Sequence, residues 1–319
     1  MKPYTLGIDT SCYTTSIAVV DHKGNLVCDK RQMLNVKKGA RGLRQSEGFF
    51  QHVMNLPTLL EQVSESVNMN DIGCIAVSTR PRNQENSYMP VFNAGERFAK
   101  TLALGLKVPM FTTTHQDGHI MASAHGCRFN HNEEHISVHL SGGTSELLKS
   151  KWSEGQFDVQ IIGGSLDVSA GQLIDRVGVA LGLEFPSGKH LDGLWKGSTK
   201  KLKFPVSVKG SYFNLSGAES YGLKYGESNE SIEDISKGLF EALLKTLEKA
   251  LITACEETGI NSVLMAGGVS ASKFLSSRLP DVLNKQGISV KFCPPQFAAD
   301  NAIGVALLGA LNRGESNEN

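Results

Sequence analysis

Two stretches decide the fold: YTLGIDTSCYTTSIAVVD (residues 4–21) and, much later in the chain, HISVHLSGGTSELLKS (residues 135–150). In each stretch, two runs rich in Val, Ile and Leu flank a turn of Ser, Thr or Gly, which is the pattern of strand, polar turn and strand. The repetition indicates two similar halves that begin in the same way. In such a pair of halves, each hairpin turn can offer backbone N–H groups to a phosphate between them. The repeat therefore predicts a nucleotide-binding fold of two related α/β halves.

The segments around these hairpins alternate between helical and strand-like spacing, which indicates α/β architecture. Helices are expected at 47–67, 93–107, 169–183 and 231–259, and buried strands at 72–79, 108–111 and 262–269. A last apolar helix is expected at 301–313. The stretch 184–230 is rich in Lys, Gly and Ser and is expected to be mostly loop.

Composition limits the class of protein. The chain has 319 residues, 20% charged and 40% hydrophobic, which is enough for two domains of a soluble protein. The 32 basic residues balance 32 acidic ones, so no global field draws the chain to nucleic acid or to a membrane. No apolar run has the length of a membrane span, and the N-terminus lacks the layout of a signal peptide. No C-x-x-C occurs among the six cysteines, which excludes zinc-ribbon spacing, and a cytoplasmic location is expected.

THQDGH (residues 114–119) contains two histidines four residues apart. On a helix this spacing places His115 and His119 on one face, where they can share a metal ion. The alternative is an ordinary pair of surface or core histidines. His135 and His139 form a rival pair on one face of a predicted strand.

Two glycine turns follow predicted strands, at 141–143 and 266–268. Glycine lets backbone N–H groups approach a phosphate closely, although a simple tight turn explains either one alone. Asp9 ends the first strand and either orients a metal or water near the phosphates, which makes it a weak catalytic candidate, or caps its turn. Asp175 lies within an apolar helix, and adjacent residues do not face each other, so we expect it to point away from Arg176 toward a ligand hydroxyl. The alternative for Asp175 is a helix-surface charge.

Six stretches together resemble the TsaD-type tRNA threonylcarbamoyl-transferase family, once labelled O-sialoglycoprotein endopeptidase (peptidase family M22). In order, they are LGIDTSC, THQDGH, LSGG, AGQLIDRVGVALGLEFPSG, LMAGGVSAS and ADNAIGVALLG. The resemblance runs over nearly the whole chain. It implies two actin-like (ASKHA, ribonuclease-H-like) domains with a nucleotide and metal cleft between them. The expected domains are 1–130 and 131–300, with the helix 301–313 packing back on the first.

The resemblance also implies an activity. Members of the family transfer a threonylcarbamoyl group from threonylcarbamoyl-adenylate to N6 of an adenosine in tRNA. It implies one divalent metal ion, Fe or Zn, on His115, His119 and Asp300, and an adenine nucleotide or adenylate as ligand. With the glycine turns, the expected contacts of this ligand are Ser141, Gly142, Gly143, Thr144, Asp175, Gly188, Asp192, Gly267, Gly268 and Ser272. TsaB-like and TsaE-like proteins are the implied partners.

Several positions depart from the family pattern. Tyr13 and Thr14 stand where the family usually has an Asp-Glu pair, and TRPRNQENSYMP (residues 79–90) replaces a Gly-Pro-Gly loop. The family's His is missing from S-G-G-T-S (residues 141–145), Ser272 replaces an Asn, and FNLSGAES (residues 213–220) replaces FSFSGLKT. A carboxylate near the reacting amine can accept its proton, whereas neutral Tyr and Thr cannot. We therefore expect transfer that is slow or that depends on partner proteins.

Local clusters of basic residues are the only candidates for a tRNA footprint in a neutral chain, although such clusters are more often solvated loops. They are Lys37, Lys38, Arg41 and Arg44; Lys196, Lys200, Lys201, Lys203 and Lys209; and Arg80 and Arg82. Two other functions stay open: a non-catalytic nucleotide-binding scaffold of the tRNA-modification system, and a carbamoyl-transferase acting on another acceptor. Peptidase activity is disfavoured, because Gln116 follows His115 where H-E-x-x-H has its general base.

Overall fold

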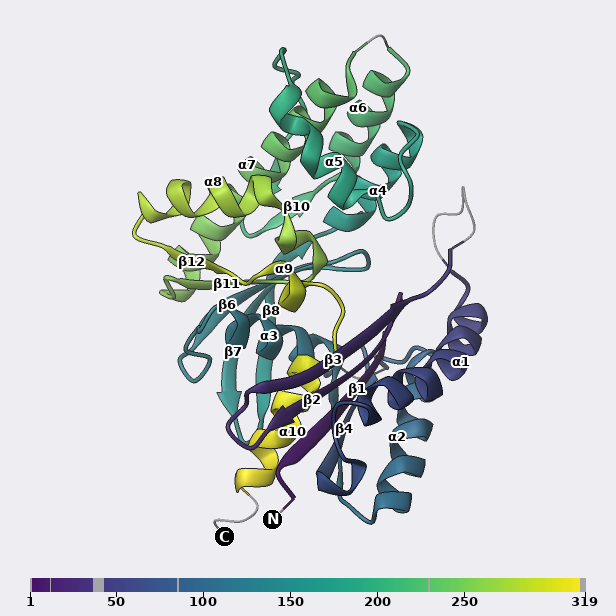
Figure 1. Cartoon of the computed structure of the whole chain (residues 1–319). Helices are drawn as coiled ribbons and strands as arrows, with labels where there is room; N and C mark the ends of the chain where they lie inside the picture. Colours follow the sequence, from purple (N-terminus) through teal and green to yellow (C-terminus); the bar gives the residue numbers. More distant parts are fainter. Residues whose placement is uncertain (1, 12, 37–42, 85, 229, 316–319) are drawn as a thin grey trace.

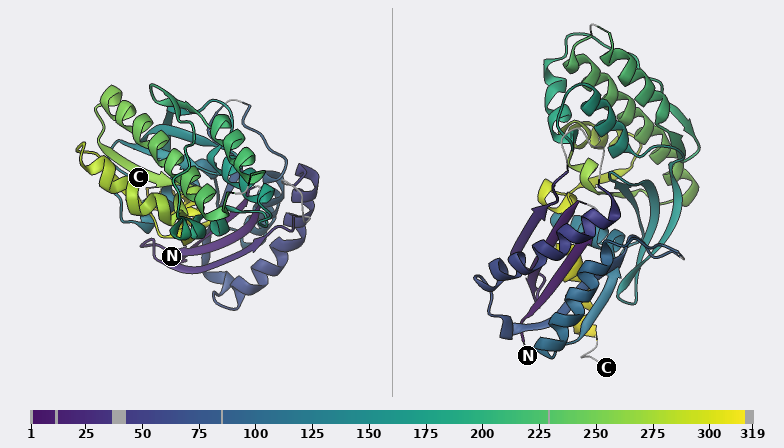
Figure 2. Two further views of the ribbon diagram at one scale, coloured as in Figure 1. Left: turned by 90° about the horizontal axis from the view of Figure 1, so that it is seen from above. Right: turned by 90° about the vertical axis from the view of Figure 1, so that its right-hand side faces the viewer.

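A computed structural model describes residues 2–11, 13–36, 43–84, 86–228 and 230–315 of the chain. Cys12, Lys37, Lys38 and Arg41 lie outside the described residues. The molecule has two lobes, each built around its own β-sheet, and both chain ends lie in the same lobe (Figures 1 and 2). Within the described ranges, no helix is long and apolar enough to cross a membrane.

The first sheet has five strands in the order β3-β2-β1-β4-β5. The strands are β1 (Tyr4–Ser11), β2 (Thr14–Asp21), β3 (Leu26–Met33), β4 (Ile72–Arg80) and β5 (Met110–Thr114). β1 and β2 form an antiparallel hairpin that β3 extends, whereas β4 and β5 join β1 in parallel. The hairpin predicted at 4–21 is confirmed.

Helices cover both faces of this sheet. They are α1 (Gln45–Ser64), α2 (Phe92–Leu106), α3 (His115–Gly126) and α10 (Ile303–Glu315), with a short 3₁₀ turn η1 (Met69–Asp71). Ile17 and Val19 of β2 pack with α1 and α2, while the alternate residues Ala18 and Val20 pack with α3 and α10. Alternation of side chains along a strand thus gives the sheet two apolar faces.

Glycines let α10 approach the first lobe closely, although it ends the chain (yellow in Figure 1). A Cβ on Gly7 of β1 would lie 2.6 Å from the carbonyl oxygen of Ala302. A Cβ on Gly304 would overlap the backbone of Gly118 in α3. This contact brings the residues just before α10, including Asp300, beside the first turn of α3. The domain boundaries expected at 130 and 300 stay a prediction.

The second sheet has seven strands in the order β12-β11-β6-β7-β8-β10-β9. The strands are β6 (His135–Leu140), β7 (Ser145–Ser153), β8 (Gln156–Ser165), β9 (Ser207–Lys209), β10 (Tyr212–Asn214), β11 (Ser262–Ala266) and β12 (Ser289–Phe292). β6 and β7 form an antiparallel hairpin, and β11 and β12 lie parallel on the other side of β6. The second hairpin is therefore confirmed, and it stands in its sheet as β1 and β2 do in theirs.

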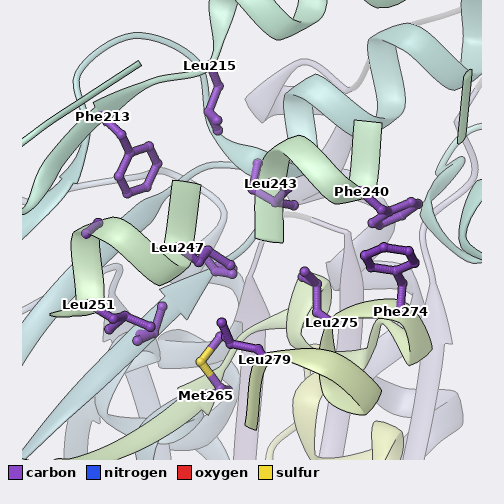
Figure 3. Packing of buried hydrophobic residues seen from close by; sticks show 14 of the residues in the cluster. Phe213, Leu215, Phe240, Leu243, Leu247, Leu251, Met265, Phe274, Leu275 and Leu279 are labelled. Atoms are coloured by element: carbon purple, nitrogen blue, oxygen red, sulfur yellow. The ribbon is translucent and has the colours of Figure 1, made fainter. Parts of the chain in front are cut away.

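Most helices of the second lobe enclose its largest apolar core. The helices of this lobe are α4 (Ala170–Ala180), α5 (Gly188–Leu194), α6 (Ser216–Gly226), α7 (Ile232–Thr258), α8 (Lys273–Asn284) and α9 (Pro295–Ala298), with 3₁₀ turns η2 (Trp195–Gly197) and η3 (Gly268–Ala271). Phe240 and Leu243 of α7 face Phe274 and Leu275 of α8 in this core (Figure 3). The stretch 184–230, expected to be mostly loop, contains α5, α6, β9 and β10. These short elements are anchored by few buried side chains, among them Leu191 and Ala218, so they leave little periodic signal.

Candidate metal and nucleotide cleft

Two histidines and a carboxylate meet between the end of β5 and the start of α10. His115 and His119 lie on the first turns of α3, whose N-terminus is capped by Thr114 accepting a hydrogen bond from the backbone N–H of Asp117. The two Nε2 atoms are 3.1 Å apart, and His119 Nε2 is 3.3 Å from Asp300 Oδ1. The three ligand atoms lie within 4.8 Å of one another. Two imidazoles with one carboxylate suit Fe(II) or Zn(II), so the residues present fit the expected ion.

Asp9 contacts the ring nitrogen of His115 that faces away from the candidate metal site. Its Oδ1 lies 3.1 Å from His115 Nδ1, so the Nε2 atom of the same ring is left to face His119 and Asp300. Ser78 of β4 donates a hydrogen bond to the same carboxylate oxygen, and Asp9 is fully buried. A carboxylate that orients the far nitrogen of a ligand histidine is a common feature of metal sites. The other carboxylate oxygen, Oδ2, accepts from the backbone N–H of Ser11 at 3.4 Å, so Asp9 also caps its turn, and its catalytic role stays a prediction.

The charges of the cluster shift its pKa values in opposite directions. Burial disfavours the charged form of His115, but Asp9 and Asp300 outweigh it and raise the pKa of His115 to about 9. Burial and the neighbouring His115 lower the pKa of His119. Burial would raise the pKa of Asp300, but the hydrogen bond with His119 and the charge of His115 hold it below its usual value. The two carboxylates are thus ionised at neutral pH and can attract a cation.

The alternative histidine pair, His135 and His139, does not lie together in the structure. His139 lies against His119, with ring centroids 5.1 Å apart, and its Nδ1 is 3.3 Å from Thr144 Oγ1. His135 lies at the other end of β6, against the ring of Phe129 at 4.9 Å. His139 Nε2 is buried and has no hydrogen-bond partner among the described residues. His135 and His139 therefore do not converge on one site, and His139 belongs to the surroundings of the His115 cluster.

Arg31 of β3 holds the segment that carries Asp300. Its guanidinium donates to the carbonyl oxygens of Gln296, at 2.6 Å, and Asp300, at 3.4 Å, and it pairs with Asp29 at 2.6 Å. No local sequence signal marks Arg31 as part of the site, because Gln296 and Asp300 lie 265 and 269 positions away from it.

The two glycine turns of the second lobe lie side by side. A Cβ on Gly267 would come 2.4 Å from the carbonyl oxygen of Leu140, and Gly267 has φ 86°, so only glycine suits this position. In the other turn, Ser141 Oγ accepts hydrogen bonds from the backbone N–H groups of Gly143 and Thr144. Cβ atoms on Gly142, Gly143 and Gly268 would meet open space. A ligand can therefore approach these glycines closely, and their nucleotide contact stays a prediction.

The remaining polar candidates face backbone groups. Asp175 accepts a hydrogen bond from Ser187 N at 2.7 Å, just before Gly188 begins α5. Asp192 accepts from Ser272 Oγ at 2.5 Å and from Lys273 N at 2.8 Å, at the start of α8. Both carboxylates thus have internal structural partners. A ligand contact by either of them stays a prediction.

The basic candidates differ in their surroundings. Lys200 pairs with Glu230 at 3.0 Å, and Lys196 lies over the ring of Trp195. Arg80 donates to Asn83 at 2.7 Å, whereas Arg82 pairs with Glu146 of the second lobe. The basic patches are thus spread over both lobes.

Comparison with known proteins places this geometry in a family. A family model described as TsaD, tRNA N6-adenosine threonylcarbamoyltransferase, matches residues 46–307. A tRNA N6-adenosine threonylcarbamoyltransferase of Sulfurihydrogenibium sp. (strain YO3AOP1) is 33% identical over 316 residues, covering 95% of this chain and 89% of that protein. One of Thermosipho africanus (strain TCF52B) is 29% identical, covering 95% and 92%.

Solved structures show the fold. HypF of T. kodakarensis aligns with a TM-score of 0.62 at 14% identity, over 98% of this chain and 48% of that one. Component A of the Acidaminococcus fermentans (R)-2-hydroxyglutaryl-CoA dehydratase aligns with a TM-score of 0.58 at 16% identity, over 98% and 99%. The fold is the two-sheet actin-like (ASKHA) α/β fold expected from the sequence. With the family model matching most of its length, the chain belongs to the TsaD family.

Proposed function

We propose that this chain transfers a threonylcarbamoyl group from threonylcarbamoyl-adenylate to N6 of adenosine in tRNA. The convergence of His115, His119 and Asp300 in a member of the TsaD family is the observation that carries the proposal. These residues come from two segments about 180 positions apart, and the chain holds them within ligand distance of a common centre. A structural role alone would not need two imidazoles, the buried carboxylate of Asp9 and the half-buried carboxylate of Asp300 in one cluster.

The ion would be Fe or Zn, held by His115, His119 and Asp300. When bound, it would supply Lewis-acid polarisation of an oxygen of the donor. The chain's own contribution would be mainly positioning, with Asp9 fixing the ring of His115 and Arg31 fixing the backbone of Asp300. The adenylate would lie against the glycine turns at Ser141–Thr144 and Gly267–Gly268, where Gly142, Gly143 and Gly268 leave open space for a close approach.

The test is an in vitro transfer assay with the purified chain, Zn(II) or Fe(II), threonylcarbamoyl-adenylate and unmodified tRNA. Mass spectrometry of the digested tRNA should detect threonylcarbamoyladenosine. The His119→Ala variant should lose the product, whereas His125→Ala, on the same helix but exposed, should retain it. Metal content after dialysis should follow the same order. Product formation by His119→Ala at the wild-type rate would contradict the proposal.

Partner proteins enter the same assay. TsaB-like and TsaE-like proteins would be needed if transfer by the chain alone is slow, as the Tyr13 and Thr14 substitutions predict. The tRNA would be held by local basic residues, including Arg44, Lys201, Lys203 and Lys209, and its binding should therefore weaken steeply with salt. A tRNA substrate also agrees with a cytoplasmic location.

A second candidate is a non-catalytic nucleotide-binding scaffold of the tRNA-modification system. The observation that favours it is Tyr13, whose ring packs edge-on against Phe185 at 5.6 Å where the family has a carboxylate. A scaffold would bind metal and adenine nucleotide yet form no product, even with partners present. Product on an amine other than tRNA would instead indicate a carbamoyl-transferase with another acceptor. Peptidase activity stays disfavoured, because the one acid between the histidines, Asp117, is buried and its Oδ2 accepts a hydrogen bond from Thr113 Oγ1 at 3.5 Å.

A further inference from the structure

One carboxylate of the second lobe is held entirely by donors of the first lobe. Arg82 Nη1 donates to Glu146 Oε1, and Gln116 Nε2 donates to Glu146 Oε2 at 3.1 Å. The side chain of Glu146 is only 14% exposed and that of Arg82 30%, so solvent screens this contact only in part. Each oxygen of the carboxylate thus has its own donor, from two different segments of the first lobe.

The donors belong to the metal side of the cleft. Gln116 directly follows the candidate ligand His115 on α3. Its backbone N–H donates to the carbonyl oxygen of Pro81 at 2.9 Å, so the segment carrying Arg82 is tied to the first turn of α3. Arg82 and Gln116 are therefore both connected to the segment that carries the candidate ligands His115 and His119.

The acceptor belongs to the nucleotide side. Glu146 is the second residue of β7 and lies two positions after Thr144, the last residue of the Ser141–Thr144 turn. In the β6–β7 hairpin it stands directly opposite His139, whose ring lies against His119. The Arg82–Glu146–Gln116 bridge thus joins the segment that carries the metal candidates to the turn expected to hold the adenylate.

We propose that Glu146 is a positioning residue that couples the metal site to the Ser141–Thr144 turn through this bridge. The inference rests on the proposed function, because it takes the metal and the adenylate to bind at these two places. A donor molecule that contacts both lobes needs them at one separation, and misplacement by about 1 Å can cost a large factor in rate. The bridge holds the two lobes at that separation. A metal ion bound by the first lobe should therefore favour the arrangement of the lobes in which the second lobe binds the adenylate, and the adenylate should favour metal binding in the same way. Such coupling is reciprocal by thermodynamic necessity.

The experiment measures the dissociation constant of Zn(II) with and without AMP, and that of AMP with and without Zn(II), by calorimetry on the full chain. In the wild-type protein, each ligand should lower the dissociation constant of the other by roughly 5-fold or more, the lower end of ordinary coupling. Glu146→Gln should reduce this factor to about one while each ligand alone still binds. A purely structural role would instead weaken stability or both separate affinities and leave the factor unchanged.

Matched variants separate the bridge from general charge effects. Glu134→Gln removes another ion-paired glutamate next to the same hairpin, where Lys149 is its partner at 3.1 Å, and should leave the coupling intact. The Arg82→Glu variant should lose the coupling, because it places two carboxylates opposite each other. Combining it with Glu146→Arg reverses the ion pair and should restore much of the coupling. The amide of Gln116 can then accept a hydrogen bond from the new arginine instead of donating one. If Glu146→Gln does not fold, Arg82→Gln gives the same test from the other side.

The results of this experiment test the coupling through Glu146 separately from the proposed function. Binding of both ligands to the wild type without mutual effect, or coupling that survives Glu146→Gln, overturns the inference and leaves the proposed function standing. Failure of the wild type to bind either ligand overturns the proposed function, and the inference with it.

Discussion

Candidate site carboxylates of the two lobes have different partners. In the first lobe, Asp9 and Asp300 face the nitrogens of His115 and His119. In the second lobe, Asp175 and Asp192 face backbone N–H groups at the starts of α5 and α8, as helix-capping residues do. In the sequence all four acids lie in or beside family motifs, and only the family resemblance assigns them different expected roles. The difference predicts that a carboxylate's partners, rather than its motif, distinguish the candidate metal ligands from carboxylates that hold the start of a helix.

The partners also predict what each region tolerates. A carboxylate that caps a helix stabilises the fold and gains little from a ligand. A buried carboxylate beside histidines carries a desolvation cost that a cation would offset. Substitutions in the cluster of His115, His119 and Asp300 should therefore change ligand binding. Substitutions of Asp175 and Asp192 should change stability.

The largest effect is expected for His119→Ala. Loss of one of three protein ligands should weaken Zn(II) binding by at least about 100-fold, since even changes behind the ligands typically cost 10- to 100-fold. The thermal midpoint of the metal-free protein should change much less. Competition with a chromophoric chelator measures the affinity, and His125→Ala is the control on the same helix. Equal loss in both variants would show that His119 is not a specific metal ligand.

The second prediction concerns pH in the metal-free protein. Asp9 and Asp300 raise the pKa of His115 to about 9, above the ordinary value near 6.5. Protonated His115 therefore stabilises the fold fully below pH 6.5, and this stabilisation disappears as the pH rises through 9. The pKa values of Asp9 and Asp300 are lowered and that of the neighbouring His119 is lowered too, so these groups do not titrate in this window.

Urea unfolding in the presence of a chelator, at several pH values from 7 to 9, measures this effect. The free energy of unfolding should fall with pH in the wild type and fall less steeply in His115→Gln. The same slope in both proteins would show that His115 is not the group that releases the proton.

The sequence predicts the fold well because its signals are local. The hairpins at β1–β2 and β6–β7 follow from β-branched runs around polar turns, and α7 from the apolar spacing of 231–259. The helical spacing of His115 and His119 likewise predicts that they share a face. Asp300, in contrast, needed the family resemblance, because its closeness to α3 depends on the packing of Gly304 against Gly118.

Other features of the site depend on contacts that the sequence does not show. Arg31 and Glu146 had no sequence signal, and Asp9 was a candidate whose contact with His115 no local pattern indicated. Their partners lie in distant segments or in the other lobe, and only the folded chain brings these together. The capping roles of Asp175 and Asp192 could not be told from ligand contacts, since both roles favour the same residue near the same glycines. Tertiary contact, rather than local propensity, decides these cases.

Asp192→Asn tests the second region. The change removes the charge and one acceptor from a buried group that receives Ser272 Oγ and the N–H groups of Lys273 and Phe274. Unfolding should cost about 1–3 kcal/mol less, the range for lost hydrogen bonds to a charged cap. Zn(II) affinity should stay the same. Chemical denaturation measures the stability, and Asp281→Asn, exposed on the same helix, is the control. A loss of AMP affinity without loss of stability would assign Asp192 to the ligand instead.

The smallest effect on ligand binding is expected at an aromatic contact between the two lobes. Tyr13, in the turn between β1 and β2, packs its ring edge-on against Phe185, which precedes α5 in the second lobe. An aromatic pair contributes about 0.5–1.5 kcal/mol, so Tyr13→Ala should weaken AMP binding by roughly 2- to 10-fold if the contact favours the ligand-binding arrangement. Tyr13→Phe keeps the ring and should bind AMP as the wild type does. Calorimetry on the three proteins decides: an equal loss in Tyr13→Phe would show that the hydroxyl, rather than the ring contact between the lobes, matters. In that case the hydroxyl of Tyr13 would take part in AMP binding, in the turn where the family has a carboxylate. The first lobe would then contribute a polar ligand contact from this turn as well as from the histidine cluster.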